Sequence, residues 1–287
     1  MVTDLRIATR RSSLALAQAD RVARLLIAAH PGLAIEMVEV TTAGDHDRVS
    51  PIGELTEMGA FVRAVQDAVM DGRADLAVHS LKDLPVVGPE ALILAAVPER
   101  ASPLDVLVGD GLETLPPGAL VGTGSPRRTT QLRGLRPDLR TIDVRGNVDT
   151  RLEKVASGEV DAVILAEAGL ERLGREDSIA QRLEVAEMVP APGQGVLAIE
   201  TREGDEAAEM VAAIDDRSLR ILVLAERMLL AETGAGCRSA LGALATWEGR
   251  LIRMDAYISD ERGARRAHSR GETPEAVVAE SRKALNL

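Results

Sequence analysis

The stretch that decides the fold is residues 59–85, "GAFVRAVQDAVMDGRADLAVHSLKDLP". Its first part has apolar residues at helical spacing, which predicts a helix closed by Gly72. The run "LAVHSL" then predicts a strand that leads into the loop "KDLP". Because sites in open α/β sheets collect beyond the carboxyl ends of strands, this loop is a candidate functional site.

The segments on the N-terminal side extend the same pattern. "DLRIATR" predicts a short strand, "SLALAQADRVARLLIAAHP" a helix that stops at Pro31, and "AIEMVEVTT" an alternating strand. This β-α-β-α-β order predicts an α/β lobe with helices on both faces of the sheet. Residues 156–169, "ASGEVDAVILAEAG", have the same shape of helix end, glycine, acidic residue and apolar strand, which indicates a second, similar lobe.

The C-terminal part has a different character. "RSLRILVLAERMLLAETG" predicts an amphipathic helix, and alternating segments follow before a last helix with Thr273 as N-cap and Pro274 at its first position. We therefore expect an α/β fold with two lobes built on mixed sheets and a small α+β C-terminal domain. The predicted domains are 1–97 with 196–214, 98–195, and 215–287.

Composition excludes several function classes. Aromatic residues make up 1% of the 287 residues and the net charge is −11, which argues against binding nucleic acid by stacking or through its phosphates. Arginines number 31 against 3 lysines; codon usage and recognition of carboxylates or phosphates are both open as explanations. The single cysteine and the scattered histidines predict no disulfide and no metal site. Without a signal peptide or an apolar run of ~18–20 residues, we expect a cytoplasmic protein.

Three basic junctions join strands to helices: "IATRRS" at 7–12, "VGTGSPRRTTQLR" at 121–133 and "DVRGNVDTRL" at 143–152. In the second, Ser125 is placed to cap a helix that begins with Pro126, and Arg127 and Arg128 lie in its first turn. Cations at the positive end of a helix oppose its dipole, so they indicate a bound anion. A solvated helix start is the alternative at each junction. Together the three predict a ligand with several negative charges in a cleft between the lobes.

Two further residues are candidates for chemistry. Asp83 follows Lys82 in the "KDLP" loop, where an ionised carboxylate would exchange protons or stabilise a developing cation. A Lys-Asp loop is more often simply exposed to solvent, which is the alternative here. For His79, the pattern favours a structural role within the strand over a catalytic one. Cys237 lies on the glycine-rich loop "GAGCRS", and its thiol is either inert or nucleophilic on local sequence alone.

Taken in order, eight segments resemble the hydroxymethylbilane synthase family, also called porphobilinogen deaminase. They are "RIATRRSSLALAQA", "TTAGD", residues 59–85, "VGTGSPRR", "VRGNVDTRL", "DAVILAEAGLERLG", "PAPGQGVLAIE" and "GAGCRSALGA". The resemblance covers nearly the whole chain and departs from the family pattern at Pro126, at "EMGAF" and after Cys237. It implies two lobes like those of periplasmic binding proteins and a third, smaller domain.

The resemblance also implies the activity. Four porphobilinogen molecules would be joined head to tail with release of ammonia, on a dipyrromethane cofactor held by a thioether to Cys237. Asp83 matches the catalytic aspartate, and the enzyme would be a monomer without metal, nucleic-acid or membrane partners. The positions that bind cofactor and substrate are matched by Arg10, Arg11, Ser12, Gln18, Phe61, Lys82, Thr123, Ser125, Arg127, Arg128, Arg145, Gly146, Arg151, Arg172 and Gln194.

Two other functions compete with this one. A non-catalytic, bilobal binder of polycarboxylates or other anions would explain the arginines, but it would leave Asp83 and Cys237 without a role. A dinucleotide enzyme is disfavoured, because "VGTGSPRR" has an arginine near the place of the third glycine in the dinucleotide fingerprint.

Overall fold

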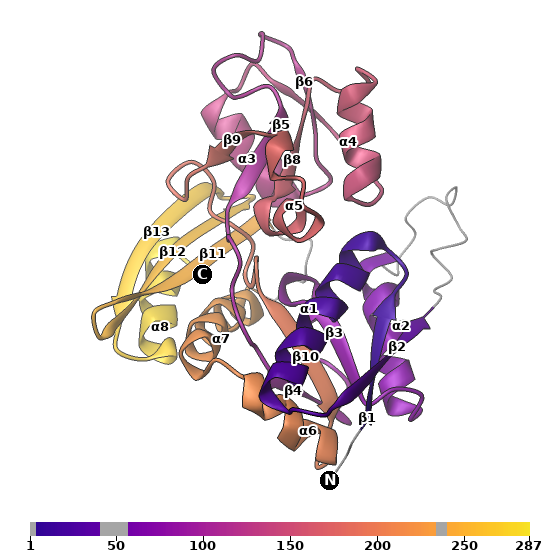
Figure 1. Ribbon diagram of the computed structural model, residues 1–287. Helices are drawn as coiled ribbons and strands as arrows, with labels where there is room; N and C mark the ends of the chain where they lie inside the picture. The colour runs from indigo at the N-terminus through magenta and orange to yellow at the C-terminus, as the bar shows by residue number, and fades with distance from the viewer. Residues whose placement is uncertain (1–3, 41–56, 234–239) are drawn as a thin grey trace. The chain divides into compact units, whose positions relative to one another are not determined.

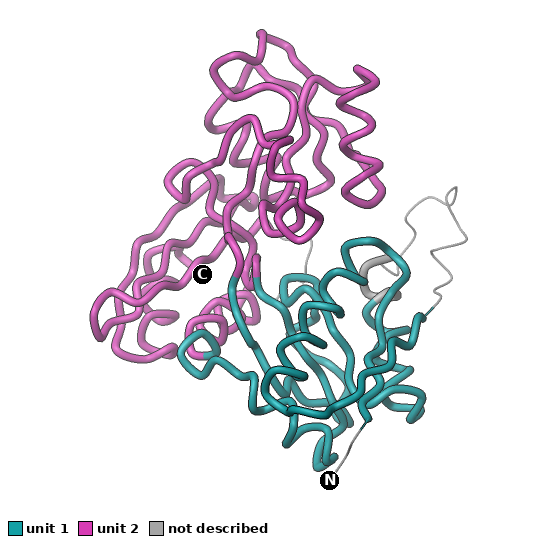
Figure 2. The backbone as a smooth tube through the Cα atoms, in the orientation of Figure 1, with its two compact units in different colours: residues 1–100, 196–220 teal, residues 101–195, 221–287 magenta. Residues whose placement is uncertain are grey.

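The computed structural model describes residues 4–40, 57–233 and 240–287, with side chains from residue 62 onward in the second stretch. The chain forms two compact units (Figure 2), one from residues 1–100 and 196–220 and the other from residues 101–195 and 221–287. The first unit is thus discontinuous in sequence. The finer three-domain division stays a prediction.

The first unit is built on a five-stranded sheet with the order β2-β1-β3-β10-β4. β1 runs parallel to β2 and β3, whereas β10 is antiparallel to β3 and β4. The sheet is therefore mixed. The antiparallel strand, β10, comes from late in the sequence and lies between the early strands β3 and β4. The strands are β1 (Asp4–Arg10), β2 (Ala34–Val40), β3 (Leu76–Ser80), β4 (Leu92–Ala96) and β10 (Leu197–Arg202).

Two long helices cover the two faces of this sheet (Figure 1), as the sequence predicted. Successive strand residues point to opposite faces: Ile7 packs in one core with α1 (Ser13–Ala29), and Ala8 in another with α2 (Glu57–Met70). Ser12 caps α1, its side chain accepting a hydrogen bond from the backbone N–H of Ala15. The unit also holds the short helices η2 (Leu81–Asp83), α6 (Glu206–Val211) and η4 (Ala212–Ile214).

The second unit contains a sheet of the same design, with the order β7-β6-β8-β5-β9. β6 pairs in parallel with β7 and β8, and β5 is antiparallel to both of its neighbours, β8 and β9. This parallel between the sheets confirms the predicted pair of similar α/β lobes. The elements are β5 (Asp105–Gly109), β6 (Leu120–Gly122), α3 (Pro126–Leu135), β7 (Arg140–Ile142), α4 (Val148–Ala156), β8 (Ala162–Ala166), α5 (Glu167–Leu173), η3 (Glu176–Ser178) and β9 (Ile179–Leu183).

An antiparallel three-stranded sheet completes the second unit, with α8 against it in Figure 1. One face of β11 (Ala240–Glu248), β12 (Leu251–Asp260) and β13 (Gly263–Gly271) packs on α7 (Arg217–Glu232) and α8 (Pro274–Leu285) around an apolar core. α8 begins as predicted, with the side chain of Thr273 accepting from the N–H of Ala276 and with Pro274 at the first position. The expected small α+β region is confirmed.

Candidate active site

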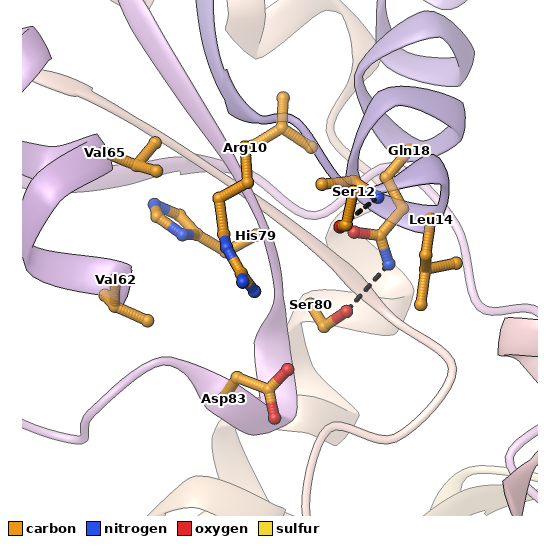
Figure 3. Close-up of a pocket in the computed structure, with 11 residues that line it drawn as sticks. Arg10, Ser12, Leu14, Gln18, Val62, Val65, His79, Ser80 and Asp83 are labelled. Carbon is orange, nitrogen blue, oxygen red and sulfur yellow. Dashed lines mark hydrogen bonds between the residues drawn. The ribbon is translucent and has the colours of Figure 1, made fainter. Parts of the chain in front are cut away.

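A pocket lies at the carboxyl ends of β1 and β3 in the first unit, which is the edge predicted from the "KDLP" loop. Arg10 ends β1, Ser80 ends β3 and Asp83 lies in η2 directly after it (Figure 3). Apolar side chains of α2 form a further wall, among them Val62 and Val65. Parallel strands bring the basic end of β1 and the acidic loop after β3 together, although they are far apart in sequence.

The polar wall of this pocket is ordered by a long-range hydrogen bond. Nε2 of the buried Gln18 donates to Oγ of Ser80 at 2.8 Å, which joins α1 to the end of β3 (Figure 3). Asp83 is partly buried beside them, and among the described residues its carboxylate forms no hydrogen bond or ion pair. A carboxylate without a protein partner in a pocket is available to a ligand.

The other sequence-predicted residues of this unit differ in placement. Arg11 lies outside the pocket lining, where its Nε forms an exposed ion pair with Oε2 of Glu39 at 3.0 Å. Ser12 lines the pocket while capping α1. Lys82 is partly buried in η2. The side chain of Phe61 lies outside the described part of the chain.

A buried polar cluster reaches the pocket through His79, and its other members were missed in the sequence. His79 lies in β3 as predicted, and its Nε2 is 3.1 Å from Oε2 of Glu200, although the two are not aligned for a hydrogen bond. Nε2 of Gln66 donates to both oxygens of Glu200, at 3.2 and 2.9 Å. The available signal was the glutamate in the otherwise apolar run "VLAIE". A buried acid of this kind needs partners.

In the second unit, the start of α3 gathers several predicted residues. Ser125 occupies the N-cap position and Pro126 the first turn, as expected, but the side chain of Ser125 makes no capping hydrogen bond. The predicted cap is therefore wrong in its bonding, and the hydroxyl stays available. Thr123 is buried, and its Oγ1 accepts from the N–H of Ser125 at 3.3 Å.

Arg127 and Arg128 are buried and share one carboxylate, that of Asp105 on β5. Nη1 of Arg127 donates to Oδ2 at 2.6 Å, and Nη2 of Arg128 donates to Oδ1 at 2.7 Å. Nε2 of Gln194 donates to Oδ1 at 3.0 Å. Burial opposes ionisation of Asp105, but the charges of the two arginines outweigh it and hold the pKa of Asp105 well below its usual range.

The arginines in the first turn of α3 predicted a bound anion. One anion that they bind is the carboxylate of Asp105, from the chain itself. Asp105 was missed because "LDVLVG" shows only an aspartate before an apolar strand, a pattern that solvated strand ends share. The arginines still suit an acidic ligand. Of the three guanidinium nitrogens of Arg127, only Nη1 is hydrogen-bonded to described residues. It donates to Asp105 and to the carbonyl oxygen of Val189.

The remaining predicted residues of this unit are Arg145 and Gly146 in the loop between β7 and α4, Arg151 in α4 and Arg172 in α5. Arg145 is exposed, with its Nε 3.7 Å from Oδ2 of Asp143. Nε of Arg151 donates to the carbonyl oxygen of Gly146 at 3.0 Å. Arg172 donates through Nη2 to the carbonyl oxygen of Gly195 at 2.7 Å, next to Gln194.

Cys237 lies outside the described residues. The helix α7 that precedes it carries the buried Glu226, another residue that sequence analysis missed. Its Oε2 accepts from the N–H of Gly193 at 2.7 Å and its Oε1 from the N–H of Ala245 at 2.9 Å. One carboxylate thus joins the loop that carries Gln194 to strand β11.

Residues 5–210 match the family model described as "Porphobilinogen deaminase, dipyromethane cofactor binding domain". The chain belongs to the porphobilinogen deaminase family. It is 48% identical over 253 residues to the porphobilinogen deaminase of Roseiflexus castenholzii, covering 87% of this chain and 84% of that one. The Thermobifida fusca enzyme is 47% identical over 96% of this chain and 89% of its own. For the Xanthomonas axonopodis pv. citri enzyme the identity is 42%, over 93% and 90%.

Membership in the porphobilinogen deaminase family confirms the predicted enzyme class. The chain is a transferase of porphyrin and heme biosynthesis, a hydroxymethylbilane synthase that uses a dipyrromethane cofactor and porphobilinogen as substrate. The competing prediction of a non-catalytic anion binder is not favoured. The donors at the start of α3 fit this cofactor, because guanidinium and hydroxyl groups are suitable partners for its carboxylates.

Fold-level comparison adds little to this assignment. The solved structure of the methionine-binding protein MetQ is 11% identical, with a TM-score of 0.47 over 82% of this chain and 97% of that one. The fold class therefore rests on the sheet order itself. Within the described residues, helices long and apolar enough to cross a membrane are absent, as are clusters of His, Cys, Asp and Glu suited to a metal ion.

Proposed function

We propose that this enzyme builds hydroxymethylbilane with Asp83 as the carboxylate that serves the reacting pyrroles, on a dipyrromethane bound through Cys237. One observation carries the role of Asp83: its carboxylate lies in the pocket beside Arg10 without a partner among the described residues. Because Cys237 is the only cysteine of the chain, a thioether to a cysteine has a single possible position.

Asp83 acts on the substrate. In each addition the C–N bond of the aminomethyl group breaks and ammonia leaves, so positive charge develops on the pyrrole. A fixed carboxylate stabilises that charge and holds the pyrrole N–H as a hydrogen-bond acceptor. When the new C–C bond has formed, the proton displaced from the ring carbon must be removed, and Asp83 is the acceptor in this pocket.

The basic residues bind carboxylates. When bound, the dipyrromethane supplies the free pyrrole carbon to which the first substrate is joined. Each substrate brings an acetate and a propionate, so the acidic load grows by two carboxylates per addition. Arg10 and Ser12 supply donors in the pocket of the first unit. Ser125, Arg127 and Arg145 are further candidate donors, and each charge-assisted hydrogen bond contributes about 1.5–3 kcal/mol.

Intact mass and turnover test both assignments. We expect freshly purified protein to carry a mass excess of two pyrrole units, and Cys237→Ala to lack it. Asp83→Asn keeps the shape of the side chain, so we expect it to retain that excess while kcat falls roughly 100-fold or more, as when a charge-stabilising group is removed. The exposed Asp110→Asn serves as the matched control for loss of one carboxylate.

Two outcomes would contradict the proposal. Near-normal release of tetrapyrrole by Asp83→Asn would remove its catalytic role, and an unmodified but active wild-type chain would remove the covalent cofactor. We also propose a cytoplasmic monomer without a nucleic-acid partner; the net charge of −11 disfavours both self-association and binding to phosphates. Sedimentation of the purified holoenzyme tests the monomer.

A further inference from the structure

The buried start of α3 carries an unusual charge arrangement. Two consecutive arginines of the first helical turn reach one fully buried carboxylate, and the three groups together have a net charge of +1. Nε and Nη2 of Arg128 donate to Oδ1 of Asp105 at 2.9 and 2.7 Å, which orients that guanidinium along two bonds. Nη1 of Arg128 also donates to the carbonyl oxygen of Ile164 at 2.9 Å.

This arrangement depends on Asp105. Two cations at the positive end of a helix repel the dipole and each other, and burial makes both effects stronger. Without the carboxylate, the side chains of Arg127 and Arg128 would have a lower free energy if they turned outward to water. Gln194 adds a third, neutral donor to the same carboxylate, from a loop far along the chain.

Asp105 occupies only some of the donors around it. The side chain of Arg127 is only 4% exposed, yet its Nε and Nη2 have no hydrogen-bond partner among the described residues. The hydroxyl of Ser125, two residues earlier, makes no capping bond. Guanidinium donors without protein acceptors, on a side chain that is otherwise buried, mark a place where an acidic ligand completes the hydrogen bonding.

We propose that Asp105 is a positioning residue for this enzyme: it holds Arg127 and Arg128 in the conformation that receives a carboxylate of the dipyrromethane cofactor. Asp105 itself does not touch the ligand, since its own oxygens face the arginines and Gln194. This inference rests on the proposed binding role of Arg127 and adds the group that makes that role possible.

The test compares Asp105→Asn with a matched destabilised variant. Asp105→Asn keeps the shape but removes the charge, whereas Leu170→Ala opens a cavity in the core on the opposite face of the same sheet. Intact mass measures the fraction of folded protein that carries the two-pyrrole excess, with far-UV circular dichroism to match the folded fraction. The KM for porphobilinogen is measured beside kcat.

We expect at least a fivefold lower cofactor fraction in Asp105→Asn than in Leu170→Ala at equal folded fraction, with a KM raised at least fivefold. Equal cofactor fractions and an unchanged KM would overturn the inference. Should Asp105→Asn fail to fold, Gln194→Leu decides, because it removes one donor without exposing a charge. Its expected effect is about twofold in the same direction, and an unchanged cofactor fraction and KM would refute the role. A wild type without the mass excess would instead contradict the proposed function.

Discussion

Glu226 offers a quantitative test of how the second unit is held together. Its buried carboxylate accepts one hydrogen bond from the backbone of Gly193 and one from that of Ala245. A hydrogen bond to a charged group contributes about 1.5–3 kcal/mol, so Glu226→Ala should cost about 3–6 kcal/mol of the free energy of unfolding. Glu226→Gln keeps one acceptor oxygen and should cost about half of that.

Losses of this size are large against a total stability of about 5–15 kcal/mol. The assay is urea unfolding followed by the fluorescence of Trp247, the only tryptophan, which lies on β11 close to Ala245. Glu232→Gln is the matched control on the same helix. Its exposed partner Arg282 lies 3.2 Å away, and such a pair contributes about 0–1 kcal/mol.

The expected order of stability is wild type and Glu232→Gln first, then Glu226→Gln, then Glu226→Ala. If Glu226→Gln were as stable as wild type, the carboxylate would not be the acceptor that holds the two segments. Equal losses in Glu226→Gln and Glu226→Ala would show that the effect comes from packing rather than from the count of hydrogen bonds.

Three further predictions concern other parts of the chain. Burial raises the pKa of Asp75, but the hydrogen bonds and charge of Arg6 and the charge of Arg202 together outweigh burial and lower this pKa below its ordinary 3.8. The stabilisation from the ionised carboxylate is present above pH 3.8 and is lost as pH falls through the lowered pKa. Asp75→Asn should therefore differ from wild type in urea unfolding less at pH 3 than at pH 7. Gly204→Ala should lower the free energy of unfolding by about 1 kcal/mol, because its backbone is left-handed and its Cβ would meet no neighbour. Gly195→Ala should lower it clearly more, because its Cβ would also lie 2.5 Å from a backbone oxygen; the thermal midpoints of the two variants check this order. Gln18→Leu removes the donor to Ser80 and should lower kcat/KM up to about tenfold; a change under twofold would contradict an ordering role.

Local features of the fold were predictable from short stretches of sequence. The helix starts at Ser12 and Thr273 follow from side chains that accept from the N–H three residues later, and such contacts depend only on neighbours in the chain. The strand that ends in "KDLP" is recognised from its apolar run, and its exit places Asp83 at the sheet edge. The motif series likewise identified the family, because order and spacing along the chain suffice for that purpose.

The partners of buried charges were not predictable in this way. Ser125 stands where a cap is expected, yet no capping bond forms, since local pattern determines position and not the bond. Nothing local connects Asp105 with Gln194, which is 89 residues away. Gln66 and Glu200 are 134 residues apart.

The sequence by itself thus determined the order of helices and strands, the basic junctions and the family of this chain. Tertiary structure decided which donors meet each buried carboxylate. Strand β10 enters the first sheet and brings Glu200 to Gln66, and the loop before β10 brings Gln194 to Asp105. The physical reason is the range of each effect. Backbone sterics and capping act over a few residues, whereas a buried carboxylate is stabilised only by donors that folding brings from distant segments.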